Sequence, residues 1–405
     1  NESSLLERVD VWLEQSAEPA DLLNPTTANL KAVTNIDYDA KGQRVRIAYN
    51  EADHPILTEY TYDPATFRLI RLVTTRPKHP ETGQRTVQDL SYTYDPVGNI
   101  TDIRDAAQQT VFFDNARIEP SNAYSYDALY RLIHAEGREH AKQNNTQRDA
   151  QDFEPIIGIP FPNSPEALQR YSEDYEYDPV GNILGLLHTG GGTQRWVRWY
   201  QYALDSNRLL SPRLPGEAAK LPFYVATPGY LGQYSYDVHG SMTKMPNLAQ
   251  MGWDFKDQLQ RVDLGGGGTA FYVYDGSGQR VRKVIERLNG SRQKERIYLG
   301  GFEVYREYDG SGNTVNLARE TLHVMDDQQR IALVETRTQG IDDSLPQLIR
   351  YQLGNHLESA SLEMDEQAKL ISYEEYHPYG TSAYRAGRNA AEVKAKRYRY
   401  TGMER

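Results

Sequence analysis

The sequence predicts an all-β protein, in which hairpins built on a repeated Tyr-Asp corner join edge to edge into one long, curved sheet. Tyr-Asp dipeptides recur along the chain, the residues before them alternate aromatic and small polar side chains, and the residues after them suit tight turns. Alternation with a period of two is typical of a strand with one buried face. Because a hairpin alone is marginally stable, each must pair with its neighbours, and accumulated twist curls the sheet.

The stretch 91–104, with the sequence SYTYDPVGNITDIR, shows the repeated unit in full. Its first part alternates tyrosine with a small polar residue, as a half-buried strand does. Asp95, Pro96 and Gly98 then suit the first, second and fourth positions of a type I turn. A Gly that adopts positive φ after such a turn is the usual ingredient of a bulged loop, so the stretch predicts a bulged β-hairpin.

The same corner recurs eight times, at Tyr38-Asp39, Tyr62-Asp63, Tyr94-Asp95, Tyr126-Asp127, Tyr177-Asp178, Tyr236-Asp237, Tyr274-Asp275 and Tyr308-Asp309. Six of these pairs have a second Tyr two residues earlier, and six have a Gly three residues after the Asp. The corners at Asp63 and Asp127 lack that Gly, so we expect a different turn there. We expect degenerate copies at 49–50, 202–209 and 253–254. All eight pairs are assigned a structural role as repeat corners, with each Asp capping its turn.

Composition limits the architecture and the class of partner. A chain of 405 residues is long for one compact core, and the repeats favour a single extended array over 1–405. Loop insertions are expected at about 138–170 and 210–232, where prolines and polar residues interrupt the repeats. The net charge of −11 argues against nucleic acid or an anionic membrane as the main partner. No apolar run approaches the roughly 18 residues that span a bilayer, so no membrane insertion is expected.

Two segments near the start of the chain leave alternatives open. Residues 1–13 fit an amphipathic helix or a strand, and we favour the strand because Val9, Val11 and Leu13 alternate along it. The segment 16–34 contains two prolines and is expected to form a loop, or a short helix around 25–30.

The sequence indicates no catalytic, cofactor-binding or metal site. With zero Cys, a disulfide framework and a thiolate metal site are both excluded. The glycine runs at 190–192 and 265–268 lack the Lys and Ser/Thr of a phosphate loop, so they are expected to be hairpin tips. Neighbouring residues on a strand face opposite sides, so the acidic pairs cannot act as proton-sharing dyads; these pairs are 326–327, 342–343 and 374–375. We therefore expect no enzyme.

The basic segment 385–399 has two interpretations. It is expected to be a solvated helix or loop on an otherwise acidic protein, and a nucleic-acid patch is the alternative. The Asp-Gly-Ser-Gly tips after Tyr274 and Tyr308 lack the second and third acidic ligands of a calcium loop, so calcium is not expected there.

The pattern Y-x-Y-D-x-x-G-N, together with YDALYRL at 126–132, resembles the Tyr-Asp (YD) repeat of the RHS family. That family includes the B and C components of bacterial insecticidal toxin complexes, other RHS polymorphic toxins and the animal teneurins. The stretches 374–380 and 398–405 are similar to the approach to the family's RHS-associated core. In the family, hairpins form a sheet that spirals into a hollow shell around a toxic C-terminal polypeptide.

The resemblance implies a segment of shell wall in a secreted or extracellular toxin complex. Its expected partners are the enclosed toxin polypeptide, which is the protein's own C-terminal tail, and other toxin-complex subunits. Relatives cut themselves with aspartates beyond the Gly-Met-Glu-Arg stretch, so none of these residues carries over, and we expect an excerpt truncated at both ends. Two alternatives stay open: a teneurin-like cell-surface adhesion module, and a carbohydrate-binding or hydrolytic β-solenoid with aromatic platforms at 196–200.

Overall fold

A computed structural model of the chain confirms the all-β fold class and shows two long sheets. It describes residues 5–14, 17, 19–50, 53–80, 82–113, 115–141, 156–157, 168–191, 194–214, 216–217, 220–326, 329–389, 392–393 and 396–404. Hairpin follows hairpin, so nearly all neighbouring strands are consecutive in sequence and antiparallel. Among the described residues, no helix has the length and apolar character needed to cross a membrane.

The first sheet has 14 strands in the order β1-β2-β3-β4-β5-β6-β7-β10-β11-β13-β14-β15-β16, with β17 paired in parallel to β15. Its strands are β1 (Val9–Val11), β2 (Leu30–Tyr38), β3 (Arg44–Tyr49), β4 (Ile56–Tyr62), β5 (Leu69–Thr75), β6 (Thr86–Tyr94), β7 (Ile100–Asp105), β10 (Ser121–Tyr126), β11 (Leu132–His140), β13 (Leu168–Tyr177), β14 (Ile183–Gly190), β15 (Gln194–Ala203), β16 (Leu209–Pro212) and β17 (Tyr224–Val225).

The second sheet has 13 strands in the order β12-β31-β30-β29-β28-β27-β26-β25-β24-β23-β22-β21-β20. Its strands are β12 (Ile156–Ile157), β20 (Gln250–Trp253), β21 (Leu259–Asp263), β22 (Thr269–Tyr274), β23 (Arg280–Glu286), β24 (Arg292–Leu299), β25 (Phe302–Tyr308), β26 (Val315–Met325), β27 (Arg330–Gln339), β28 (Gln347–Gly354), β29 (Ala360–Met364), β30 (Leu370–Tyr376) and β31 (Ser382–Gly387).

Short elements connect or cap these sheets. Two separate two-stranded sheets pair β8 (Val111–Phe113) with β9 (Ala116–Ile118), and β18 (Ser235–Tyr236) with β19 (Met242–Lys244). The 3-10 helices are η1 (Pro25–Thr27), η2 (Gly265–Gly267) and η3 (Tyr400–Gly402). The N-terminal segment forms a strand, β1, as favoured from the sequence. The loop expected over 16–34 ends earlier than predicted, because residues 30–34 belong to β2.

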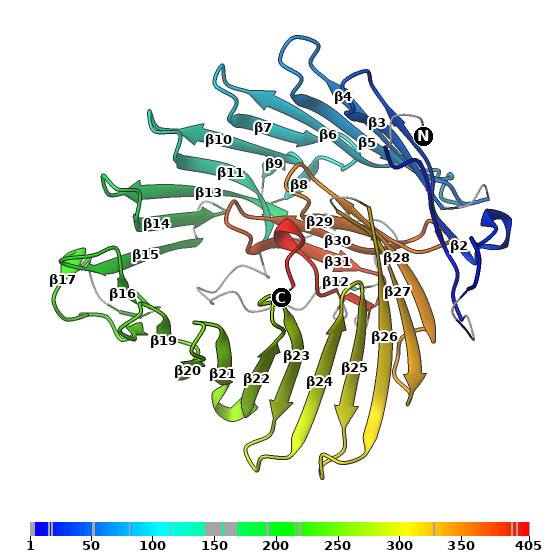
Figure 1. The fold of residues 1–405 in the computed structure, drawn as a ribbon. Coiled ribbons are helices and arrows are strands. Elements are labelled where there is room, and N and C mark those ends of the chain that lie inside the picture. The colour runs from blue at the N-terminus through cyan, green and yellow to red at the C-terminus, as the bar shows by residue number, and fades with distance from the viewer. Residues whose placement is uncertain are drawn as a thin grey trace.

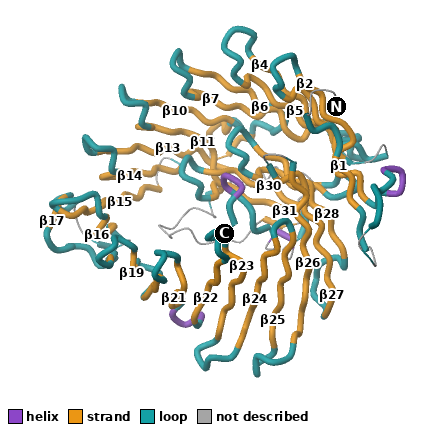
Figure 2. The backbone as a smooth tube through the Cα atoms, in the orientation of Figure 1, coloured by secondary structure: helices purple, strands orange, loops and turns teal. Residues whose placement is uncertain are grey.

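The two sheets follow one curved path, which Figure 1 shows from blue through green to red. The path turns once around, and β29, β30 and β31 then lie inside the curve, against the concave face of the first sheet (Figures 1 and 2). The expected single sheet is interrupted near β16–β20, where the strands are short. The segment 210–232 holds four prolines there, and proline cannot donate to a sheet ladder.

The predicted insertions fall at particular places in this path. Within 138–170, the structure describes 138–141, 156–157 and 168–170, which belong to the ends of β11 and β13 and to β12; the other residues lie outside the described part. Within 210–232, the end of β16 and the short β17 lie on the first sheet.

The largest core lies between the two layers of the curve. It combines Ile47, Ile56 and Tyr49 of the first sheet with Tyr351 and Met364 of the second, and all five side chains are almost fully buried. Burial of apolar surface from both sheets is favourable, at about 25 cal/mol per Å². Hydrophobic contact between strands that are far apart in sequence therefore holds the inner layer against the outer one.

Candidate functional site

All eight Tyr-Asp pairs lie at hairpin corners. At the corner of β6 and β7, the Asp95 N–H donates to the Asn99 carbonyl at 2.9 Å, and the Gly98 N–H donates to the Asp95 carbonyl at 3.1 Å. Gly98 has φ of +112°, as a bulged type I hairpin requires. The ladder register shifts just before the motif tyrosine at every one of the eight corners.

The aspartate of each corner caps its own turn. Asp95 Oδ1 accepts hydrogen bonds from the backbone N–H groups of Val97, Gly98 and Asn99, at 2.7–3.1 Å. Such bonds favour the ionised form of a carboxyl group. At Asp309, bonds from the Ser311 hydroxyl and from backbone N–H groups lower the pKa to about 2. The carboxylates are thus occupied by turn formation.

The two corners without the expected Gly behave differently from each other. At Asp63 the turn is longer by one residue, because the N–H that returns to the Asp63 carbonyl belongs to Phe67. At Asp127 the expectation of a different turn is wrong. Tyr130 adopts φ of +64°, and the corner makes the same backbone bonds as the glycine corners. Tyr130 therefore adopts the positive φ that a glycine adopts at the same position of most other corners.

The motif tyrosine joins most corners to the preceding one. Tyr94 donates its hydroxyl hydrogen bond to the Leu69 carbonyl at 2.6 Å, and Leu69 is the first residue of the strand that leaves the preceding corner. The same bond runs from Tyr38 to Leu6, Tyr62 to Arg44, Tyr126 to Ile100, Tyr177 to Leu132, Tyr236 to Leu209, and Tyr274 to Leu259. Tyr308 bonds Glu295 instead. This series of bonds is termed the tyrosine ladder below.

Degenerate copies take part in the same arrangement. Tyr202 donates to the Ile183 carbonyl at 2.8 Å, and Trp253 donates through its indole N–H to the Met242 carbonyl at 2.7 Å. Corners also occur at Asn355, Asp365 and His377, which lack a preceding Tyr-Asp pair in sequence. The sequence HPYG at 377–380 predicts the last of these corners, and this prediction is confirmed. In the structure, the residue three positions after each corner residue has positive φ.

Replacing Tyr94 by Phe is expected to lower the free energy of unfolding by about 0.5–1.5 kcal/mol, since one bond of the tyrosine ladder is lost. Chemical denaturation measures the change. Tyr130→Phe is the matched control, because that side chain is 60% exposed and is expected to cost almost nothing. Equal effects of the two changes would show that the ladder bond does not stabilise the sheet.

Replacing Gly312 by Ala is expected to destabilise the chain more than replacing Gly42 by Ala. Both glycines have φ near +80°, which costs an alanine about 1–2 kcal/mol. A Cβ on Gly312 would lie 2.5 Å from the Arg292 backbone nitrogen, whereas one on Gly42 meets nothing within 4 Å. Urea denaturation of both variants checks the order, and a smaller effect at Gly312 would contradict the close packing of neighbouring corners.

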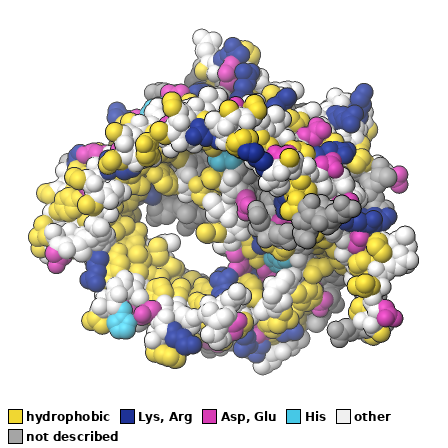
Figure 3. All heavy atoms as spheres, turned by 45° about the horizontal axis from the view of Figure 1, so that its top comes forward, with side chains coloured by type: hydrophobic (Ala, Val, Ile, Leu, Met, Phe, Trp, Pro, Cys, Tyr) yellow, Lys and Arg dark blue, Asp and Glu magenta, His cyan; other side chains and the backbone are white. Residues whose placement is uncertain are grey.

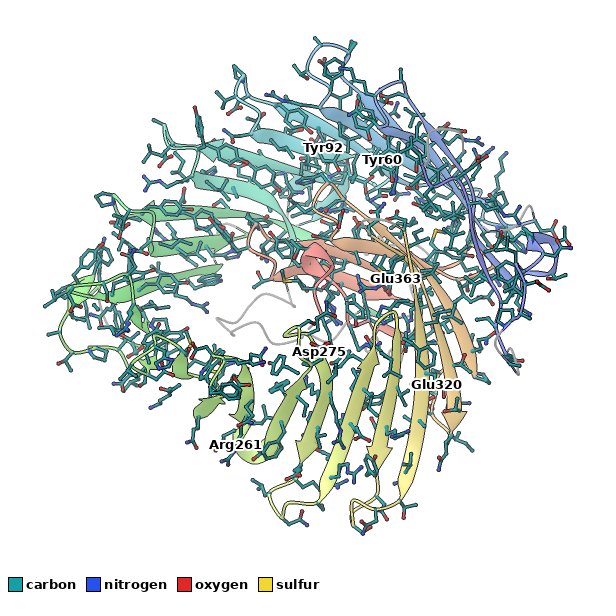
Figure 4. The ribbon with its side chains drawn as sticks, in the orientation of Figure 1. Tyr60, Tyr92, Arg261, Asp275, Glu320 and Glu363 are labelled. Carbon is teal, nitrogen blue, oxygen red and sulfur yellow. The ribbon has the colours of Figure 1, made fainter. Side chains whose placement is uncertain are left out.

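The tyrosine face of the first sheet is the concave one. Tyr60 and Tyr92 point from β4 and β6 toward the inner layer (Figure 4). Tyr92 packs edge-on against His356, with ring centroids 5.2 Å apart. A cavity of about 430 Å³ lies between the layers beside these residues, lined from one side by Tyr124 and Ile103 and from the other by residues of the second sheet.

A largely buried ion pair also joins the two layers. Arg138 of β11 is 2% exposed and makes a bidentate pair with Glu375 of β30, at 2.6–3.0 Å. On the other face of β30, Glu374 lies 3.1 Å from Lys396 Nζ. The adjacent glutamates thus face opposite sides and serve separate contacts, as strand geometry requires.

The basic segment is not the solvated surface expected from its charge, nor a nucleic-acid patch. Arg385, Lys396 and Arg399 are each no more than 5% exposed, and all three surround Glu374 within 4 Å. A buried carboxylate requires such partners, because an unpaired buried charge is costly. These three residues of the segment therefore pack against β30, within the curve of the sheets.

The buried carboxylate of Glu374 makes the stability of the chain depend on pH. Burial alone would raise the pKa of Glu374, but the charges of Lys396, Arg399 and Arg385 lower it from 4.5 to about 2. Stability from this depressed pKa is present above the unfolded-state value and is lost as pH falls from about 4.5 toward 2. The stability difference between wild type and Glu374→Gln is expected to shrink over that range. Denaturation from pH 6 to 2.5 measures it, and a constant difference would contradict the pairing.

A second buried cluster lies at the junction of β11, β13, β14 and the His377 corner. Burial alone would raise the pKa of Glu139, but hydrogen bonds from His188 and His377 lower it to about 2. Burial alone would lower the pKa of His188, but Glu139 and Glu173 raise it to about 9. Sequence analysis missed this cluster because its members are far apart. The sequence carried no local signal that relates these three residues.

The aromatic stretch 196–200 is used for packing. The Trp196 ring stacks on His188 with centroids 4.8 Å apart. The Trp199 ring covers Gly185, where an added Cβ would lie 2.1 Å from its Cζ3 atom, and Lys220 lies 4.3 Å from the ring centroid. These rings are half-buried and already have partners, so they do not form open platforms for sugars.

No protein-family model matches the chain. The toxin subunits YenC1 and YenC2 of Yersinia entomophaga are 32% and 31% identical to it, over 92% and 91% of this chain. The crystal structure of TcdB2-TccC3-TEV matches with a TM-score of 0.77 at 29% identity, over 94% of this chain and 17% of that one. This chain is homologous to the RHS shell region of toxin-complex subunits. The structure of the Photorhabdus luminescens Tc holotoxin pore matches this RHS chain with a TM-score of 0.76, at 28% identity, over 94% of this chain and 17% of that one.

The RHS chain spans 37% of the length of each Yersinia relative. The resemblance drawn from the Tyr-Asp corners is therefore confirmed for the region that these corners occupy. The fold of this chain agrees with the fold of the solved toxin-complex structures over 94% of its length.

Proposed function

We propose that the RHS chain forms part of the wall of a hollow shell that encloses a toxin polypeptide, the C-terminal tail of its own protein, before delivery. The wall acts by exclusion and carries no catalysis of its own. It works in a secreted toxin complex, in contact with other toxin-complex subunits.

The tyrosine ladder on the concave face is the observation that supports this proposal. Most corners bond to the strand that leaves the preceding corner, so the wall is held together from its concave side. The space-filling view shows an opening within the curve, with hydrophobic side chains gathered along part of its rim (Figure 3). An apolar inner rim suits a polypeptide held without its own folded core.

Protease protection in the full-length protein tests the proposal. The tail is expected to resist a protease that rapidly digests the same tail expressed alone, because the wall excludes the enzyme. Electron microscopy of the same preparation is expected to show a hollow particle with internal density. A solid or open-ended rod, or a tail digested at equal rates in both forms, would overturn the proposal.

A further inference from the structure

Two histidines from distant parts of the chain meet one buried glutamate. Glu139 is on β11, His188 is on β14, and His377 is at the corner after β30, 238 residues from Glu139. Their exposed fractions are 0%, 2% and 6%. One oxygen, Glu139 Oε2, lies 3.2 Å from His188 Nε2 and 3.3 Å from His377 Nε2.

These separations lie at the long end of the hydrogen-bond range and also suit ligands of a shared ion. Charged N–H···O bonds are usually about 2.7–2.9 Å. Exposed His–carboxylate contacts in this chain range from 2.7 Å at His134–Asp174 to 3.3 Å at His134–Glu136. Ligand atoms bound about 2.0–2.1 Å from a tetrahedral zinc ion lie about 3.3–3.4 Å from one another. The separations at Glu139 match that edge length.

The groups around the two imidazoles already have the arrangement of a second coordination shell. His188 Nδ1 lies 3.2 Å from Glu173 Oε1, and His377 Nδ1 lies 3.0 Å from Thr381 Oγ1, so both Nε2 atoms are left facing Glu139. Partners of this kind fix the tautomer of metal-binding histidines. The ring of His188 is also held between Trp196 and Tyr171, stacked at 9° and 12° to it.

Charge points to a divalent cation. Glu139 and Glu173 place two carboxylates in a region where both side chains are no more than 5% exposed. Buried carboxylates need positive partners, and a doubly charged ion compensates both of them while its histidine ligands are neutral imidazoles. Imidazole and carboxylate ligands without thiolate suit Zn²⁺ among the common ions.

We propose that Glu139, His188 and His377 bind one Zn²⁺ ion, which fastens the inner layer of the wall to the outer one. The ion bridges β11 and β14 of the first sheet to the corner that closes β30 and β31. Zinc takes up this position as the two layers come together, and its binding free energy adds to the stability of the closed wall. The chain has no cysteine, so a metal ion would provide the kind of cross-link that a disulfide provides in other proteins.

Metal content tests this proposal directly. Protein carrying the complete chain is expressed with zinc supplied, freed of loosely bound metal by gel filtration, and analysed by mass spectrometry. About one zinc per chain is expected for wild type, with at least about a 100-fold loss of affinity in His188→Gln and His377→Gln. Glu173→Gln is expected to lose about 10–100-fold against a competing chelator. His134→Gln keeps full zinc content, because His134 makes an exposed carboxylate pair elsewhere.

Absorption at the zinc edge keeps the test decisive if a variant fails to fold. Wild-type protein is expected to show nitrogen and oxygen ligands in fourfold coordination, and its unfolding midpoint is expected to fall when a chelator is present during refolding. Wild type with less than a tenth of a zinc per chain, or with the same zinc content as folded His188→Gln, would overturn the proposal and leave a buried His–Glu ion-pair cluster.

Discussion

Replacing Arg350 by Met is expected to lower the free energy of unfolding by about 3–5 kcal/mol. Arg350 is 1% exposed on β28 and pairs with Glu335 on β27 and Glu363 on β29. The two carboxylates are 5% and 0% exposed, so removal of the cation leaves both buried in a medium that poorly stabilises charge. Guanidinium denaturation, followed by tryptophan fluorescence, measures the loss.

A triple replacement and a surface pair make this result specific. Changing Arg350 to Met together with Glu335 to Leu and Glu363 to Gln is expected to recover most of the lost stability, because no unpaired charge remains buried and the residue at 363 can still hydrogen-bond with Ser372 and Gln352. Arg71→Met removes an exposed pair with Asp89 and is expected to cost under about 1 kcal/mol. A loss at Arg350 as small as that at Arg71 would show that its two carboxylates find other compensation.

The corners were predictable from sequence because turn chemistry is local. The type of turn follows from four consecutive positions, which include Asp95, Pro96 and Gly98. The two tyrosines before them indicate which face of the strand is buried. Even the bulge follows from a Gly at positive φ. The prediction at Asp127 was wrong because the absence of Gly was taken to exclude the same turn. Tyrosine disfavours positive φ without forbidding it, and the surrounding hairpin imposed that conformation on Tyr130.

The layering was not predictable from sequence, since it depends on contacts between distant strands. Arg385, Lys396 and Arg399 read as surface charge because nothing near them in sequence shows that Glu374 is buried opposite them. Likewise, no periodicity in the strands relates Arg138 to Glu375, which are 237 residues apart. The hydroxyl of a corner tyrosine needed a partner on physical grounds, but its identity depended on which strand lies alongside.

Replacing Tyr351 by Ala tests whether the core between the layers, rather than strand pairing alone, closes the wall. Tyr351 of β28 is fully buried and meets Tyr49 of β3 edge-on, with ring centroids 6.4 Å apart. Loss of the ring leaves a cavity that neither sheet can fill while its strands stay paired, so a cost of about 3–5 kcal/mol is expected in chemical denaturation.

Tyr351→Phe removes the hydroxyl and keeps the ring, so it distinguishes their contributions to stability. The hydroxyl lies 3.4 Å from Asn50 Oδ1, so its loss is expected to cost no more than about 0.5–1.5 kcal/mol. Hydrogen exchange locates the effect: strands β27–β31 are expected to lose protection in the Ala variant, while β22–β25, which lack an inner layer in this core, keep theirs. Equal loss of protection in β22–β25 would show that the whole array unfolds as one cooperative unit. If the Ala variant were no less stable than the Phe variant, edge-to-edge pairing would be enough to hold the inner layer in place.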